Sequence, residues 1–243
     1  MNLASYRPSK GLVGFLCVLL TLNALLSLVG AGSSWLDIEL LGKYSSFDQI
    51  SNPELIAAGL RAIIVGGSGI IVFLLTVVVF CVWVVRAAKN ARALGAEGMA
   101  ISPGWCAGWF FVPFANLVMP FKGVSEIYRA SEPNVAASRG LAWQGVPLPG
   151  VLAAWWALWI ISSVLGNASF TIGSSDSITS MTNSAWLTIM SQLLSMGCAF
   201  CAISVIKLIQ MRQQMRAEAI GEDPSLANTE PMAQSFIPHA PAA

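Results

Sequence analysis

Two cysteines separated by two residues, Cys198 and Cys201, form the pattern best suited to chemistry in this chain of 243 residues. A Cys-x-x-Cys pair can exchange disulfides with other thiols. Met196 is close by in the sequence, and a thioether together with two thiols would suit a soft metal ion. Both uses depend on the compartment that the pair faces, so the surrounding elements must decide between them.

The sequence contains few candidate residues for acid–base catalysis. The single histidine, His239, lies in a terminal stretch rich in Pro, Ala and Ser, a composition typical of disorder. A general base, a haem ligand or a metal site built on histidine is therefore not expected in the rest of the chain. No phosphate-binding or dinucleotide-binding motif occurs in a suitable context. We expect a protein that is not an enzyme and that binds no cofactor.

The composition indicates an integral membrane protein. Apolar residues make up 56% of the chain and charged residues only 10%, against about 25% charged in soluble domains. Four apolar runs without Asp, Glu, Lys, Arg or His are each close to the ~20 residues that a helix needs to cross a bilayer. They cover residues 11–31, 62–85, 148–165 and 185–206. We predict an all-α, four-helix transmembrane bundle, and the net charge of +1 gives no indication of a nucleic-acid partner.

The loops predict the orientation of the spans. Of the 13 Lys and Arg residues, Lys43 and Arg61 fall on one side of the predicted membrane and all the others on the side of the two chain ends. The positive-inside rule then puts residues 1–10 and a disordered tail, 217–243, in the cytoplasm, with the membrane domain over 11–216. The first run is longer than the ~7–15 apolar residues of a signal peptide, so we expect it to be retained.

This orientation bears on the thiols. The fourth run would enter the membrane from outside, so Cys198 and Cys201 would lie in its cytoplasmic half, about 20 Å or more beyond Ala185 at 1.5 Å per residue. The other cysteines would also lie toward that side: Cys17, Cys81 and Cys106. Thiols on the reducing side usually pack as small apolar residues. We expect packing, with thiol redox chemistry and soft-metal binding as alternatives.

Between the second and third spans lies an apolar segment that does not fit a fifth span. The stretch from Trp105 to Phe121 contains Pro113 and Pro120, and prolines interrupt a helix. If it crossed the membrane, the Lys and Arg residues would also be divided less unevenly between the two sides. We predict a re-entrant or interfacial cytoplasmic element over residues 102–133, which is either a hydrophobic plug or a binding surface.

That surface would combine aromatic and charged side chains. Its candidate residues are Trp105, Trp109, Pro113, Asn116, Pro120, Lys122, Glu126 and Arg129. Glu126 is spaced to form helical ion pairs with Lys122 and Arg129. The two cations are also suited to anionic lipid headgroups. We therefore expect membrane lipids, a membrane-protein partner or a second copy of this chain to contact the surface.

Polar and aromatic side chains within the spans predict contacts between helices. The polar candidates are Asn23, Thr76 and Gln192. Asn23 and Gln192 are the expected pair, because an amide cannot satisfy its own hydrogen bonds in lipid. A second group would form an aromatic ridge on the third span: Trp155, Trp156 and Trp159. Either group can also line a ligand pocket, which remains the alternative.

Smaller features predict helix ends and close packing. Asn52 has the character of an N-cap for the second long helix, which should continue until Gly95. The Gly-Gly-Ser-Gly segment at 66–69 predicts close approach of a neighbouring helix. The last helix should continue into water beyond the membrane, with Arg212 and Arg216 on one side.

Two stretches resemble a known bacterial membrane family. The first, SPGWCAGWFFVPFANLVMPFKGVSEIYRASEP at 102–133, is similar to a segment of the family called domain of unknown function 4328. The second, VPLPGVLAAWWALWIISSVLGN, is similar to the next helix of that family and covers about residues 146–166. The resemblance implies four helices in a bacterial inner membrane, and it implies no activity.

The sequence favours a non-catalytic accessory or scaffolding protein with a cytoplasmic working surface. A small transporter, channel or lipid-binding protein for an apolar or neutral solute is the second hypothesis, with a path through the bundle. The third is a thiol redox or soft-metal protein that uses Met196, Cys198 and Cys201.

Overall fold

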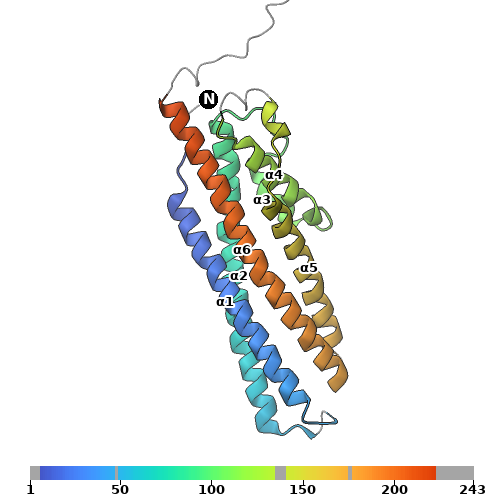
Figure 1. Cartoon of the computed structure of the whole chain (residues 1–243). Helices are drawn as coiled ribbons and strands as arrows, with labels where there is room; N and C mark the ends of the chain where they lie inside the picture. Colours follow the sequence, from blue (N-terminus) through green and yellow to red (C-terminus); the bar gives the residue numbers. More distant parts are fainter. Residues whose placement is uncertain (1–5, 47–48, 135–140, 175–176, 223–243) are drawn as a thin grey trace, which may run out of the picture. The chain divides into compact units, whose positions relative to one another are not determined.

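The computed structural model describes residues 6–46, 49–134, 141–174 and 177–222, and the regular elements in these ranges are all helices (Figure 1). The long ones are α1 (Lys10–Leu41), α2 (Asn52–Ala93), α5 (Gly150–Gly173) and α6 (Ile178–Glu222). The shorter ones, where η marks a 3-10 helix, are α3 (Pro103–Gly108), η3 (Trp109–Phe111), η4 (Ala115–Leu117), α4 (Met119–Ala130) and η6 (Ala142–Gly145).

Within the described residues, four helices are long and apolar enough to cross a membrane, which confirms the predicted all-α membrane fold. They are α1, α2, α5 and α6. Large apolar side chains also cover their outer surfaces, for example Phe15, Leu25, Ile63, Ile64 and Phe73. Helices that are apolar all round are typical of membrane spans.

Each long helix extends beyond the apolar run that predicted it. α1 continues past residue 31 to Leu41, and α5 continues to Gly173, beyond residue 165 where the predicted span ends. α6 reaches Glu222, so residues 217–222 of the predicted tail are helical, and Ile220 is buried. The rest of the predicted tail lies outside the described residues. The difference arises because helix propagation is cooperative and does not stop where the apolar run ends.

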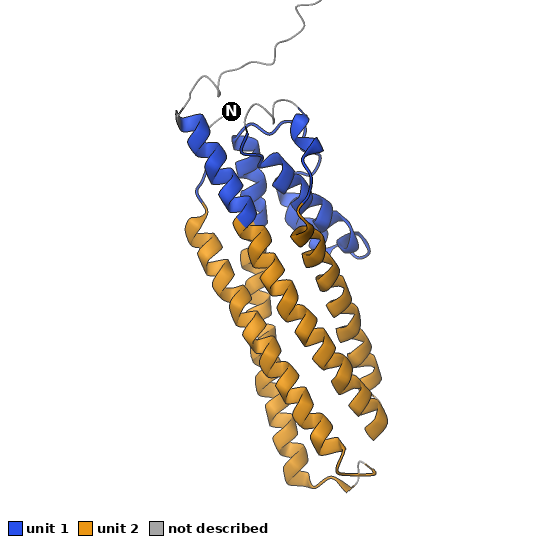
Figure 2. Cartoon of the chain, in the orientation of Figure 1, with its two compact units in different colours: residues 1–8, 84–148, 208–243 blue, residues 9–83, 149–207 orange. Residues whose placement is uncertain are grey.

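The chain forms two compact units, which Figure 2 distinguishes by colour. Unit 1 consists of residues 1–8, 84–148 and 208–243, and unit 2 of residues 9–83 and 149–207. α2 and α6 contribute residues to both. Unit 1 also contains the short helices named above, whereas unit 2 contains the apolar parts of the long ones.

In unit 2, a polar contact joins α1 and α2. Asn23 donates from Nδ2 to Oγ1 of Thr76 at 2.6 Å and to the carbonyl oxygen of Leu19 at 2.9 Å. The expected pairing of Asn23 with Gln192 is therefore replaced by one with Thr76. Gln192 lies instead beside Gly30, where an added methyl group would be 3.0 Å from its Nε2. Asn23 of α1 therefore finds its partner on the next helix, α2, and not on α6, where Gln192 lies.

Small and hydroxyl-bearing residues bring α5 and α6 together. Ser169 donates from Oγ to the carbonyl oxygen of Ser184 at 2.8 Å and lies 2.6 Å from Oγ1 of Thr188. A methyl group at Gly173 would be 2.6 Å from Oγ of Ser184. By contrast, methyl groups at Gly66, Gly67 and Gly69 would meet nothing within 4 Å. The prediction of close approach at residues 66–69 is therefore wrong, because small residues permit close packing but do not require it.

The predicted aromatic ridge of α5 packs within unit 2. Trp156 and Trp159 stack with ring centroids 4.7 Å apart, and Trp155 meets Trp156 edge-on at 5.4 Å. Trp155 also lies 6.1 Å from the ring of Phe80 on α2, and its carbonyl oxygen accepts the thiol of Cys198 at 3.6 Å. These contacts give the ridge a structural use at the helix interfaces.

The ends of α2 are set by local hydrogen bonds and by one glycine. The carboxylate of Glu54 accepts from the hydroxyl of Ser51 at 2.6 Å and from its N–H at 3.3 Å, which is the acidic half of a capping box. The N-cap is therefore Ser51, one residue before the predicted Asn52. At the other end, Gly95 has a φ of 89° and ends the helix in the left-handed position that favours glycine.

Candidate functional site

Arg216 is fully buried in unit 1, at the C-terminal ends of two helices. Its Nε donates to the carbonyl oxygen of Leu94, just after α2, at 2.9 Å. Its Nη1 donates to the carbonyl oxygens of Ala130 (3.4 Å) and Glu132 (3.1 Å), at the end of α4. Such terminal carbonyl groups lack donors within the helix and carry the negative end of its dipole. One guanidinium therefore caps both helices.

Burial lowers the pKa of Arg216 to about 10, although the Glu132 carboxylate opposes the shift. The guanidinium is consequently still protonated at neutral pH. Hydrogen bonds from Nε and Nη1 to carbonyl oxygens replace bonds to water and partly offset the cost of burying this charge, whereas Nη2 has no partner among the described residues.

Two buried amides continue this polar core. Gln213 donates from Nε2 to the carbonyl oxygen of Ala87 at 2.8 Å and to Oγ of Ser131 at 3.0 Å, and it accepts from Nδ2 of Asn90 at 3.4 Å. Asn90 in turn accepts from the N–H of Arg7 at 3.1 Å and donates to its carbonyl oxygen at 3.0 Å. These bonds tie the N-terminal segment, α2, α4 and α6 into one unit.

Arg212 adds a partly exposed contact at the edge of this core. It forms an ion pair with Glu132, donates to the hydroxyl of Tyr128 at 3.1 Å and lies 4.2 Å above that ring. The last helix continues beyond its apolar run as expected, but Arg212 and Arg216 do not lie on a solvated side of it. Arginines near the end of a helix are usually solvated, and nothing local in the sequence shows that two other helices end beside them. The one sequence feature that could have indicated a buried polar core is the presence of Gln213 and Arg216 in the same turn of α6.

The face of α4 that carries Glu126 holds the segment before α3. The Glu126 carboxylate accepts from the N–H groups of Ala100 at 2.6 Å and Ile101 at 3.1 Å. Arg92 donates from Nη2 to the carbonyl oxygen of Ile101 at 2.8 Å. The ion pairs expected for Glu126 are therefore absent among the described residues, because its two oxygens bind backbone instead.

Trp143 and Arg129 fix the segment that follows α4. Trp143 is buried and donates from Nε1 to the carbonyl oxygen of Glu97 at 2.9 Å. Arg129 donates from Nε to the carbonyl oxygen of Val146 at 2.9 Å. The indole of Trp143 packs in a small core with Ala91, Ala96, Ala130 and Met99.

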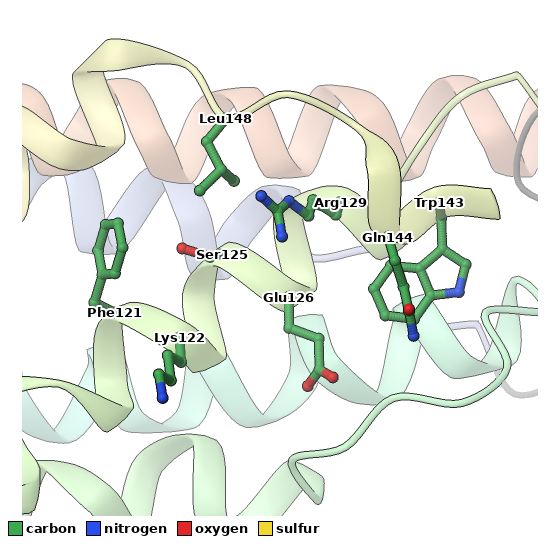
Figure 3. A pocket seen from close by; sticks show the side chains of 8 residues that line it. All are labelled: Phe121, Lys122, Ser125, Glu126, Arg129, Trp143, Gln144 and Leu148. Carbon is green, nitrogen blue, oxygen red and sulfur yellow. The ribbon is translucent and has the colours of Figure 1, made fainter. Parts of the chain in front are cut away.

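A hollow of about 520 Å³ lies between α4 and this segment (Figure 3). Its lining is Phe121, Lys122, Ser125, Glu126, Arg129, Trp143, Gln144 and Leu148. The polar residues of α4 recur every three or four positions, so they share one face of the helix. Three members of the predicted surface, Lys122, Glu126 and Arg129, therefore come together here, although not as ion pairs.

The remaining members of the predicted surface lie in α3, η3, η4 and the turns between them. Trp105 and Trp109 pack together with ring centroids 4.6 Å apart. Pro113 is exposed and Asn116 is half-buried, whereas Pro120 is buried and takes no part in a surface. The predicted surface therefore includes one residue, Pro120, that belongs to the core of this segment.

Large apolar side chains are exposed along this same segment, and we call them the 105–118 surface: Trp105, Phe111, Phe114, Leu117 and Val118. The chain carries no charged residue from Ser102 to Phe121. Phe114 is 88% exposed and has a φ of 62°, a backbone conformation that side chains other than glycine rarely adopt. An exposed aromatic ring held by a strained backbone is a feature that often accompanies a functional site.

Of the five thiols, Cys106 is buried and the other four are partly buried. Burial, and then the Glu126 carboxylate, raise the pKa of Cys106 to about 11, so its thiol is protonated at neutral pH. Cys198 and Cys201 are both free thiols, and Cys198 donates to Trp155 as described above. Among the described residues, no three His, Cys, Asp or Glu side chains gather in a metal-binding arrangement.

The model of the family described as "Domain of unknown function (DUF4328)" matches residues 48–211, which is most of the chain. The chain belongs to the DUF4328 family. The match includes α4, the hollow and the 105–118 surface, so these features lie within the DUF4328 region. No curated protein and no solved structure gives a match.

Proposed function

We propose that this DUF4328 protein is a non-catalytic membrane protein whose unit 1 is a docking platform for a partner protein. One observation carries the proposal: a compact unit combines a buried polar core with an exposed, uncharged apolar surface. The core around Arg216 and Gln213 fixes the helix ends of unit 1. The 105–118 surface presents large side chains outside that core. Exposed apolar patches of this kind are typical of interaction sites.

Chain connectivity supports a position for unit 1 on one side of a bilayer. The chain passes between the units at residues 8/9, 83/84, 148/149 and 207/208. Successive spans alternate in direction, so the start of the first, the end of the second, the start of the third and the end of the fourth face the same side. The excess of Lys and Arg favours the cytoplasmic side of a bacterial inner membrane, with both chain ends there.

The chemistry of the 105–118 surface favours a protein as its occupant. Helices that lie on a membrane usually combine an apolar face with Lys and Arg, whereas residues 102–121 carry no charge. Aromatic side chains with few charges are typical of the centre of protein interfaces. The partner is therefore expected to present a complementary apolar surface.

Native mass spectrometry of the tagged protein, gently extracted from its own membranes, tests the proposal. We expect a second protein in fixed stoichiometry, and we expect the double substitution Phe111→Ser with Phe114→Ser to remove it. Phe170→Ser is the matched control, because Phe170 is 84% exposed but belongs to α5 in unit 2. It should leave the complex intact.

Two other results would decide against a docking platform for a different protein. If the same variants dissociate a homo-oligomer, the partner is a second copy of this chain. If the protein stays monomeric and brominated lipids quench Trp105, the surface belongs in the bilayer and the accessory role is wrong.

The polar residues of unit 2 favour helix packing over a solute path. The amide of Asn23 donates to Thr76 and to the carbonyl oxygen of Leu19. The hydroxyl of Ser169 on α5 donates to the carbonyl oxygen of Ser184 on α6. For this reason we favour the docking platform over the transporter hypothesis.

A further inference from the structure

The hollow beside α4 carries two cationic side chains without a carboxylate partner. Lys122 is exposed, and its side-chain ammonium makes no hydrogen bond or ion pair within the part of the chain that the structure describes. Among the described residues, Arg129 bonds only through Nε, to the carbonyl oxygen of Val146, and both Nη atoms have no partner there. Two cationic residues therefore lie on one face of α4, although Figure 3 shows their side chains pointing in different directions.

Glu126 lies on the same face but does not neutralise these cations. Both of its carboxylate oxygens accept N–H groups of the backbone, from Ala100 and Ile101. Figure 3 shows the Glu126 carboxylate and the Arg129 guanidinium pointing in different directions. The side chain of Arg129 extends toward Ser125 and Leu148 instead (Figure 3).

Ser125 supplies an independent indication of a ligand. Its residue is only 6% exposed, and its buried hydroxyl, like Nε of Arg212 and Nη2 of Arg216, has no hydrogen-bond partner among the described residues. Buried hydroxyl groups are nearly always hydrogen-bonded, and leaving one unpaired is unfavourable. The same residue lines the hollow, between Lys122 and Arg129 in the helical sequence. A ligand with acceptor oxygens would satisfy it.

We infer that this hollow binds a phosphate group. Arg129 would bind two phosphate oxygens through its Nη atoms, Lys122 would add a second positive charge, and the Ser125 hydroxyl would donate a hydrogen bond. Arginine is well matched to phosphate because its planar donors fit two oxygens at once. A volume of about 520 Å³ is within the ~300–1,000 Å³ range of ligand pockets.

The rest of the lining suits a phosphate that carries an apolar group. Phe121 and Leu148 border the hollow beside the cations, and the indole of Trp143 forms part of its wall. An anionic phospholipid headgroup and free phosphate share the required chemistry. The inference does not depend on the docking platform, because it uses none of the residues of the 105–118 surface.

The test uses the full-length protein in maltoside micelles, which contain no phosphate. Phosphatidylglycerol and inorganic phosphate are added separately, and bound ligand is measured by native mass spectrometry and by equilibrium dialysis with labelled phosphate. The variants are Lys122→Gln and Ser125→Ala. Lys89→Gln removes the same charge from an exposed position of unit 1 and is the control.

We expect about one phosphatidylglycerol or phosphate per chain, with affinity reduced about tenfold by Lys122→Gln and severalfold by Ser125→Ala, the size expected for single hydrogen bonds to a charged group. Lys89→Gln should have no effect. Binding of phosphatidylglycerol alone would identify a lipid headgroup, and binding of both would identify a site for free phosphate. The inference is overturned if neither probe binds, or if Lys89→Gln weakens binding as much as Lys122→Gln. Ser125→Ala should unfold at an unchanged or higher temperature without ligand, so a loss of binding cannot be ascribed to misfolding.

Discussion

The Nε of Arg216 donates to the carbonyl oxygen of Leu94 at 2.9 Å, although 122 positions separate the two residues in the chain. The same guanidinium also binds the end of α4. A single side chain near the end of the last helix thus stabilises the ends of two earlier helices. This relationship makes unit 1 a cooperative structure rather than a collection of loops.

Replacement of Arg216 by alanine should destabilise unit 1 strongly. Three carbonyl oxygens would lose a charged donor, and an unsatisfied buried polar group costs ~1–3 kcal/mol. We expect the free energy of unfolding to fall by about 3 kcal/mol or more, measured by thermal and denaturant unfolding of the purified protein. Lys89→Ala, at an exposed position without such contacts, should change it by less than about 0.5 kcal/mol. Equal effects of the two substitutions would contradict the capping role.

Replacement of Phe114 should separate backbone strain from surface function. Phe114→Gly relieves the positive φ and should raise the free energy of unfolding by about 1 kcal/mol, whereas Phe114→Ala keeps the strain and should not. Both substitutions remove the ring, so both should weaken the proposed partner complex. A stability gain with alanine equal to that with glycine would show that the φ of 62° is not strained.

The thiol of Cys106 should react slowly and should make stability depend on alkaline pH. With a pKa of about 11, roughly 0.1% of the thiol is ionised at pH 8, and only the thiolate is nucleophilic. Maleimide labelling followed by peptide mass spectrometry should show slow modification in the folded protein and fast modification after unfolding.

The sign of the pH effect follows from the raised pKa. Below pH 9 the thiol is protonated in both states, so its contribution to stability is complete. Between about pH 9 and pH 11 the unfolded state loses its proton first, and stability falls as pH rises. Cys106→Ala should remove this part of the decrease, and an unchanged pH dependence would contradict it.

A double-mutant cycle should distinguish the two possible partners of Asn23. Asn23→Leu and Thr76→Val should be coupled by ~0.6 kcal/mol and at most ~1.7 kcal/mol, as found for hydrogen bonds between membrane helices. Asn23→Leu and Gln192→Leu should be additive. Unfolding in mixed micelles provides the free energies, and coupling to Gln192 instead of Thr76 would restore the pairing expected from the sequence.

The sequence was sufficient for the long helices and for the family, because apolar runs of membrane length are a strong local signal. The sequence was not sufficient to predict the residues at which these helices begin and end. The residue that caps α2 is Ser51 and not Asn52. Neighbouring polar residues can all serve as caps, and only the hydrogen bond between Ser51 and the Glu54 carboxylate selects one of them. The glycines at 66–69 show the same limit, because a small residue permits a contact without specifying its partner.

The candidate site was predictable in part. Lys122 and Arg129 were recognised as cations suited to anionic headgroups, because charge and helical spacing are visible in the sequence. Ser125 and Trp143 were not recognised. Their importance depends on burial and on segments distant in the chain, such as the carbonyl oxygen of Glu97 that Trp143 binds. Arg216 was missed for the same reason.

The division of unit 1 among three chain segments imposes an order on its biosynthesis. At about 5–20 residues per second, a ribosome reaches Arg216 roughly 6 to 24 s after Leu94, given their separation of 122 positions. During that interval the ends of α2 and α4 have no donor from α6, and the nascent segment 84–148 remains open to proteases and chaperones. Once α6 has been synthesised, Arg216 can donate to the carbonyl oxygens at the ends of α2 and α4 and complete unit 1. A chain interrupted before Arg216 is therefore expected to leave the ends of α2 and α4 without these hydrogen bonds.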